Sequence, residues 1–204
     1  MQPFRIHQGK VVAIDRANID TDQIIPKQFL KRIERTGFGE FLFYDWRRQT
    51  DGKPDLSFAL NQERNRGASL LVTGKNFGCG SSREHAVWAL QDFGFRAVIA
   101  SSFADIFANN CVQNGVLTVV VTPEEAEEII RRAEQRLDYQ PTVDLEKQQV
   151  RDGYGLVASF PIEATTRHRL LNGLDDIALT LADEPAIAAF EARHPLPRSL
   201  SQTP

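Results

Sequence analysis

The sequence predicts an α/β fold with a parallel or mixed sheet and a helical C-terminal extension. The main observation is a regular alternation of short apolar runs and longer amphipathic segments between residues 69 and 137. Strands that alternate with helices at this spacing are typical of α/β domains. The pattern changes after Pro141, and no internal repeat or low-complexity segment is found. We therefore expect one domain, with a core over about 1–160 and a helical extension with a frayed end over about 161–204.

The N-terminal part begins with a short apolar run at 10–14 (KVVAI), which predicts a buried strand. The tripeptide Asp-Thr-Asp at 20–22 precedes a proline that favours the start of a short helix over 26–33. Residues 37–55 are first aromatic and then rich in turn-forming residues, which predicts a long loop. Long loops in compact domains are often functional.

The remaining elements follow from the same patterns. We expect strands at 70–73, 97–100 and 116–121 and helices at 82–93, 103–110 and 123–137. The last of these helices has the clearest start, because Thr122 precedes Pro123 and Glu125 forms a capping box with it. After Pro141 we expect strands at 142–145 and 156–160, separated by the turn Asp152-Gly153, and helices at 165–172 and 185–194.

The composition excludes several classes of protein. The formal net charge is −3 with no clustered basic residues, which argues against nucleic-acid binding. No stretch approaches the ~20 apolar residues of a membrane helix, and the first ten residues lack the pattern of a signal peptide. Cys79 and Cys111 are the two cysteines, which predicts reduced thiols and no disulfide framework or metal-binding CxxC pair. A cytoplasmic protein is expected.

The segment 74–86 (GKNFGCGSSREHA) joins a predicted strand to a predicted helix and is the main functional candidate. Ligands of open α/β sheets bind at the carboxyl ends of strands. Its three glycines allow sharp turns and a close approach to a ligand. The helix N-terminus offers free N–H groups, and Arg83 can hold a carboxylate with two hydrogen bonds. The segment predicts an anion site for a carboxylate or a phosphate.

The same segment also matches several other patterns. Ser81 and Glu84 fit a capping box, which would be purely structural. Gly78 and Gly80 match the start of a dinucleotide-binding fingerprint, but Arg83 stands where its third glycine belongs. The sequence lacks G-x-S-x-G, so a hydrolase nucleophile is poorly supported. A serine beside an arginine and a helix N-terminus can instead act as a deprotonated base, since positive charge favours the alkoxide.

Three segments resemble one family in their order and spacing: NIDTDQIIP at 18–26, GKNFGCGSSREHA at 74–86 and SFADIFANNCVQNG at 102–115. They are similar to the swivelling domain of the aconitase superfamily. With the further stretch at 26–47, the chain resembles the bacterial small subunits of 3-isopropylmalate dehydratase over nearly its whole length. The resemblance implies a swivelling β/β/α domain of the aconitase type that closes over a large subunit.

The resemblance also implies an activity and the residues that perform it. The family interconverts 2-isopropylmalate and 3-isopropylmalate through 2-isopropylmaleate in leucine biosynthesis. By resemblance, Ser81 is the catalytic base and Arg83 binds a substrate carboxylate. The other expected substrate-binding residues are Gly80, Ser82, Asp20, Thr21 and Asp22, of which the last three also have an ordinary explanation as turn and capping residues.

The reaction needs a Lewis acid for the leaving hydroxyl, and in this family a four-iron four-sulfur cluster supplies it. Such a cluster is held by cysteine thiolates, for which Cys79 and Cys111 are too few. We therefore expect no cofactor in this chain and the cluster in the large subunit. The expected partners are that subunit and a small dicarboxylate substrate, with neither nucleic acid nor membrane.

The aromatic loop, residues 38–46, is the candidate for substrate selectivity. In the family, the region that corresponds to the aromatic loop helps select the side group of the substrate. The residues that could form an apolar wall for an isopropyl group are Phe38, Phe41, Leu42 and Phe43. For about half of the residues in this loop, plain core packing is the favoured interpretation. Homoaconitate and methyl-substituted malates remain alternative substrates, and a stand-alone module that binds a dicarboxylate or a phosphate remains the alternative from another class.

Overall fold

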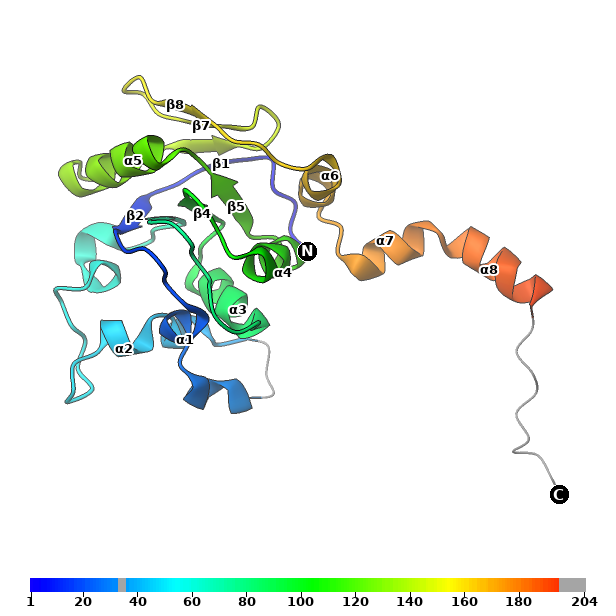
Figure 1. Cartoon of the computed structure of the whole chain (residues 1–204), viewed down its shortest axis with the longest axis horizontal. Helices are drawn as coiled ribbons and strands as arrows, with labels where there is room; N and C mark the ends of the chain where they lie inside the picture. Colours follow the sequence, from blue (N-terminus) through cyan, green and yellow to red (C-terminus); the bar gives the residue numbers. More distant parts are fainter. Residues whose placement is uncertain (33–35, 195–204) are drawn as a thin grey trace.

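A four-stranded parallel sheet lies at the centre of the chain (Figure 1). The computed structural model describes residues 1–32 and 36–194. The strands lie in sequence order: β2 (Val11–Ile14), β3 (Leu70–Thr73), β4 (Ala97–Ala100) and β5 (Leu117–Val120). These four predicted strands are confirmed to within a residue at each end. Because all four run parallel, the carboxyl ends of β2, β3 and β4 meet at one edge of the sheet.

Both faces of this sheet are buried, as is usual for parallel sheets. Val12, Leu71 and Val98 point into one apolar cluster, whereas Val11 and Leu70 point into a second cluster on the opposite face. Alternate residues of a strand point to opposite faces, so the same apolar runs supply both clusters. This explains why β3 and β4 are apolar without polar alternation.

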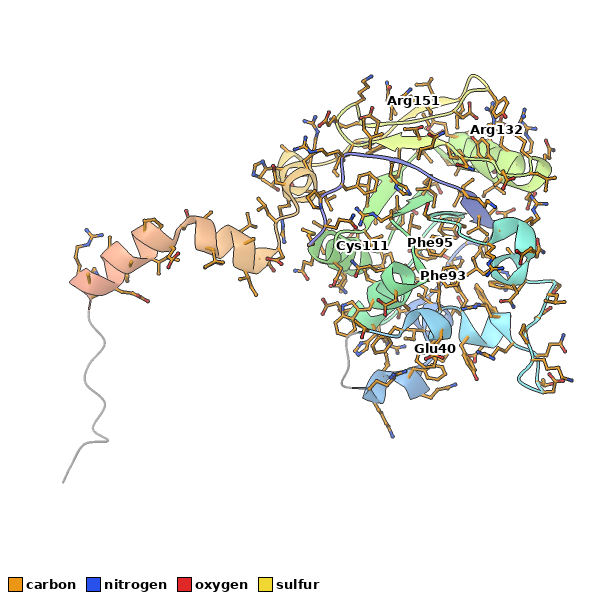
Figure 2. All side chains as sticks on the ribbon, turned by 180° about the vertical axis from the view of Figure 1, so that it is seen from behind. Glu40, Phe93, Phe95, Cys111, Arg132 and Arg151 are labelled. Atoms are coloured by element: carbon orange, nitrogen blue, oxygen red, sulfur yellow. The ribbon has the colours of Figure 1, made fainter. Side chains whose placement is uncertain are left out.

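Helices cover the first face. The longer two are α3 (Glu84–Phe93) and α4 (Asp105–Asn114), and both contribute buried residues to the first cluster. Shorter helical segments complete the layer: α1 (Thr21–Ile24), η1 (Lys27–Lys31), η2 (Gly39–Phe41), α2 (Tyr44–Arg47), η3 (Ala59–Asn61) and η4 (Glu63–Asn65). The figures show this layer from opposite sides, and in Figure 2 Phe95 and Cys111 lie within the body of the molecule, where both are buried.

The second face is covered by α5 (Pro123–Gln135) and a second sheet. This sheet is antiparallel, in the order β1 (Ile6–Gln8), β6 (Thr142–Asp144), β7 (Gln149–Arg151) and β8 (Val157–Ser159). Val143, Val150 and Ala158 point inward to the second cluster. The layers are therefore sheet, sheet and helix, which confirms the predicted β/β/α arrangement.

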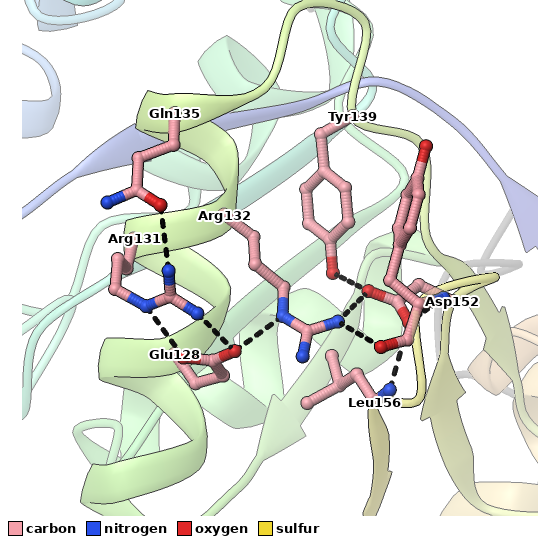
Figure 3. A network of polar contacts seen from close by, with 8 residues as sticks. Glu128, Arg131, Arg132, Gln135, Tyr139, Asp152 and Leu156 are labelled. Carbon is pink, nitrogen blue, oxygen red and sulfur yellow. Dashed lines mark hydrogen bonds and ion pairs between the residues drawn. The ribbon is translucent and has the colours of Figure 1, made fainter.

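A buried carboxylate joins α5 to the second sheet (Figure 3). The side chain of Asp152, which is 2% exposed, accepts hydrogen bonds from Arg132 on α5 at 2.5 Å and from the Tyr139 hydroxyl at 2.8 Å. The backbone N–H groups of Tyr154 and Leu156 also donate to it. Burial alone would raise the pKa of Asp152, but these hydrogen bonds outweigh it and hold the pKa below its usual value.

The C-terminal extension is helical, as predicted. It consists of α6 (Ala164–Asn172), α7 (Asp176–Ala182) and α8 (Glu184–Arg193), and Figure 1 shows α7 and α8 reaching away from the sheets. The predicted helices at 165–172 and 185–194 are confirmed to within one residue, whereas α7 was not predicted. The expected frayed end from 195 onward lies outside the described residues. Within the described part of the chain, no helix is long and apolar enough to cross a membrane.

Four sequence predictions need correction. The helix expected over 82–93 begins at Glu84, and the one expected over 103–110 runs from Asp105 to Asn114. The segment after Pro26 forms a 3-10 helix rather than an α-helix, and the predicted end at position 33 lies outside the described residues. The loop over 37–55 contains the short helices η2 and α2.

Candidate active site

The serine loop, residues 74–83, is held between the segments that follow β2 and β4. On one side, the Gly78 N–H donates to the Ile19 carbonyl at 2.8 Å. On the other side, the Phe77 N–H donates to the Ser102 carbonyl at 3.1 Å. These bonds extend the parallel pairing beyond the regular strands. The loop therefore occupies the middle of the carboxyl edge, where an α/β sheet places its ligands.

Gly78 allows the loop to pass directly over α4. Its φ is +78°, and a Cβ atom at this position would lie 2.1 Å from the ring of Phe107. No other residue fits this space without displacing the ring or the loop. The close approach keeps the loop against the first turn of α4.

The segment after β2 holds the other side of the loop. The Thr21 N–H donates to the Cys79 carbonyl and the Thr21 hydroxyl donates to the Ser81 carbonyl, each at 2.9 Å. Asp20 caps α1 by accepting from the Gln23 N–H at 2.8 Å, and the Gln23 side chain closes the capping box. The interpretation of Asp20 as a capping residue is confirmed. Thr21 fixes the backbone of the loop next to the serines.

Ser81 and Ser82 are both exposed at the end of the loop. The N-cap of α3 is Arg83, which makes no side-chain cap, so the predicted capping box between Ser81 and Glu84 is wrong. The Glu84 carboxylate instead accepts a hydrogen bond from Asn114 at 3.0 Å. The loop is shaped by its neighbours rather than by a cap, and capping no longer explains the serine at position 81.

Arg83 is the cation of the site. Its guanidinium forms a hydrogen-bonded ion pair with Asp22 of α1, and its side chain is only 10% exposed. This hydrogen bond holds the pKa of Asp22 below its usual value. Lys27 lies 3.6 Å from the other oxygen of Asp22 and is far more exposed than Arg83. The arginine thus lies beside the serines in a fixed and mostly buried position.

These groups surround a cavity of about 220 Å³. Five of the lining residues were predicted from the sequence, namely Thr21, Gly80, Ser81, Ser82 and Arg83, and the other five are Gly78, Ala104, Asp105, Ile106 and Phe107. Five of the seven residues predicted to be catalytic or substrate-binding are therefore brought together. Asp20 and Asp22 are not part of the lining.

The lining residues of α4 were not predicted from the sequence. They follow β4, which pairs with β3, the strand before the serine loop. Their place after the carboxyl end of a neighbouring parallel strand is the sequence signal that would have predicted them. Ile106 is 55% exposed although it is large and apolar. The α4 part of the lining thus combines the apolar residues Ala104, Ile106 and Phe107 with the carboxylate of Asp105.

The four residues predicted to select the substrate lie elsewhere. Phe38, Leu42 and Phe43 are fully buried in the first apolar cluster. Phe41 is partly buried and stacks on Phe29, with ring centroids 4.1 Å apart. None of the four lines the cavity. Plain core packing, the alternative interpretation of this loop, describes three of them, and a role in selectivity stays a prediction.

The described residues can be compared with the ligand set that a metal cluster requires. Among residues 1–32 and 36–194, no group of three or more His, Cys, Asp or Glu side chains could hold a metal ion. Cys111 is buried, which raises the pKa of its thiol well above the usual value. His85 packs between Phe38 and Trp88, and its pKa is lowered mainly by burial. An iron–sulfur cluster does not fit these donors.

The layered fold, with a serine–arginine loop at the carboxyl edge of its parallel sheet, defines a domain of the aconitase C-terminal type. The family model described as "Aconitase C-terminal domain" matches residues 1–124. The model LeuD_N matches residues 127–164, and the model of the C-terminal domain of 3-isopropylmalate dehydratase small subunits matches residues 176–196. The chain belongs to the family of 3-isopropylmalate dehydratase small subunits.

Individual relatives agree with this assignment. The 3-isopropylmalate dehydratase small subunit of Rhodopirellula baltica is 62% identical over 192 residues, which cover 94% of this chain and 98% of that protein. The small subunit of Geobacillus kaustophilus is 59% identical, and the match covers 95% of this chain and 98% of that protein. A crystal structure of 3-isopropylmalate dehydratase from Methanocaldococcus jannaschii superposes with a TM-score of 0.63 at 25% identity, and it covers 91% of this chain and 99% of that one.

Proposed function

We propose that this chain carries the base and a carboxylate-binding group of a two-subunit 3-isopropylmalate dehydratase, a hydro-lyase of leucine biosynthesis. The enzyme converts 2-isopropylmalate into 3-isopropylmalate by dehydration to 2-isopropylmaleate and rehydration. One observation carries the proposal: Ser81 is exposed and does not cap α3, and it lines the same cavity as the mostly buried cation Arg83. The identity to small subunits over nearly the full chain supports the reaction.

Ser81 is proposed to take the proton from the carbon next to a substrate carboxylate and to return one in the rehydration step. A base must lie within hydrogen-bond reach of the proton that it removes. The positive end of α3 and the charge of Arg83 both favour a deprotonated hydroxyl. The fixed loop backbone keeps that hydroxyl at the cavity in both half-reactions.

Arg83 is proposed to bind one carboxylate of the substrate. A guanidinium suits this role because its planar N–H groups match the two oxygens of a carboxylate. Ser82 and the backbone at Gly80 are proposed to add hydrogen bonds to the same substrate. The apolar lining residues Ala104, Ile106 and Phe107 are proposed to contact the alkyl group of the substrate.

The second half of the site is proposed to belong to a cluster-bearing large subunit in the cytoplasm. A four-iron four-sulfur cluster there would supply the Lewis acid for the leaving hydroxyl. The described residues of this chain offer no ligand group for such a cluster. The base and the arginine of this chain would then face the Lewis acid of the partner across the bound dicarboxylate.

Mixing the purified chain with a purified large subunit tests the proposal. We expect each chain alone to be inactive and the mixture to convert 2-isopropylmalate, as followed by the absorbance of 2-isopropylmaleate. Specificity constants for homoaconitate and for methyl-substituted malates are measured on the same mixture. Turnover by this chain alone would refute the requirement for a large subunit. Tight dicarboxylate binding without turnover in the mixture would favour a binding module.

A further inference from the structure

Among the described residues, Arg83 is the lining residue of the cavity that is hydrogen-bonded to Asp22. Its carboxylate forms the ion pair with the guanidinium, yet Asp22 is absent from the residues that line the cavity. Arg83, by contrast, lines the cavity and is nearly buried. One oxygen of the Asp22 carboxylate is hydrogen-bonded to Arg83, and the other lies 3.6 Å from Lys27. These facts argue against direct substrate binding by Asp22.

We propose that Asp22 is a positioning residue that orients the guanidinium of Arg83 toward the substrate carboxylate. The proposal rests on the proposed function of Arg83 as the carboxylate-binding group. It replaces the expectation that Asp22 itself binds the substrate.

The donor geometry of arginine allows one guanidinium to bind Asp22 and a substrate carboxylate at the same time. A guanidinium has five N–H donors in one plane, so a carboxylate on one side leaves the others free. The hydrogen bond to Asp22 uses one of the two terminal nitrogens, Nη1. Fixing one nitrogen restricts the plane, and the remaining donors are then pre-oriented for a second carboxylate. Less side-chain entropy is lost when the substrate binds.

Asp22 is itself held in a fixed position. Asp22 lies in α1, whose start is closed by the capping box of Asp20 and Gln23. The preceding Thr21 bonds to the serine loop through both its N–H and its hydroxyl. The ion pair and these two bonds connect the same two segments. The orientation of Arg83 is therefore fixed relative to Ser81.

A double-mutant cycle in the assembled enzyme tests the proposal. We expect Asp22→Asn to raise KM at least about tenfold, with a smaller effect on kcat, because substrate binding loses a pre-oriented arginine. In an Arg83→Gln background the same change is expected to alter KM less than about twofold. If the increase in KM of the double variant equals the product of the two single increases, the proposal is overturned, since Asp22 would then act independently of Arg83.

Two further variants separate positioning from general loss of structure. Lys27→Gln removes the exposed cation beside the same carboxylate, and we expect its KM to stay within about twofold of the parent value. Asp22→Glu keeps the charge and is expected to recover part of the lost affinity. A Lys27→Gln enzyme as impaired as Asp22→Asn would contradict the proposal, and so would Asp22→Glu without any recovery.

Nitrogen-15 NMR of the isolated chain gives a readout that is independent of activity. We expect slow rotation of the Arg83 guanidinium in the parent chain and fast rotation in Asp22→Asn. Fast rotation in the parent chain would overturn the positioning role. An inactive parent complex with slow rotation in this experiment would refute the proposed function and leave the orientation of Arg83 by Asp22 intact.

Discussion

At the residue scale, Gly78 allows the serine loop to pack closely against α4. Its Cβ position is occupied by the ring of Phe107, and its φ is positive. Gly67, between η4 and β3, has a similar φ of +75°, but nothing lies within 4 Å of its Cβ position. An alanine would therefore be similarly strained at both positions and would clash only at position 78.

We predict that Gly78→Ala lowers the free energy of unfolding about 1–3 kcal/mol more than Gly67→Ala does, because overpacking adds to the strain. Urea unfolding of the two variants measures the difference. Equal losses would show that the loop can move away from Phe107 at no cost. In that case the close approach of the loop to α4 would not position the serines.

Single residues were predictable where one chemical property decides their place. The small loop residues and the cation of the site were predicted from residue type, because glycines and an arginine before a helix favour an anion site. The burial of Phe38, Leu42 and Phe43 was not predictable, because a large apolar side chain can line a pocket or fill a core equally well. Only the packing against α3 and the sheet decides between the two.

At the scale of elements, the four strands of the parallel sheet, each with at least three apolar residues among its four, were found to within a residue, whereas β1 and β7 were missed. Each of these two has three residues, and β7 has a single buried one. Such strands exist because neighbours in the sheet pair with them, and that information lies elsewhere in the chain. The start of α3 was misjudged for a related reason. Ser81 and Glu84 match a cap, but bonds to neighbouring loops shape the segment instead.

The contact between α5 and the second sheet depends on the buried ion pair of Arg132 and Asp152 (Figure 3). We predict that Arg132→Gln lowers the free energy of unfolding by about 3 kcal/mol at neutral pH, because Asp152 is then left buried without its cation. The matched control is Arg131→Gln on the exposed side of the same helix, with an expected change within about 0.5 kcal/mol. Equal effects of the two variants would show that the buried pair does not hold α5 to the sheet.

Asp152 also predicts a pH dependence. Its pKa is lower in the folded chain than in the unfolded chain, so its ionised form stabilises the fold above the unfolded pKa. That stability is lost as the pH falls through the folded pKa. We predict that Asp152→Asn is destabilised at pH 7 and loses less further stability than the parent chain on acidification to about pH 3. Parallel pH profiles of unfolding free energy for the two chains would contradict this prediction.

At the scale of the whole molecule, the fold gathers the residues of the proposed site at one edge of the parallel sheet. Three consecutive parallel strands end at this edge, and the segments after them contribute Thr21, the serine loop with Arg83, and the first turn of α4. The α/β alternation predicted this edge from the sequence. The contribution of α4 to the lining needed the strand order, because only adjacent strands bring residues near 105 next to the serine loop.

Turnover by the assembled enzyme with Ser81→Ala decides whether this serine is the base. We predict that the variant binds the large subunit as tightly as the parent chain does and loses turnover by about 10³-fold or more, since the base is absent while the loop backbone is intact. Ser57→Ala, an exposed serine far from the loop in sequence, serves as the control and should keep full turnover. A Ser81→Ala enzyme within about tenfold of the parent rate would show that another group removes the proton.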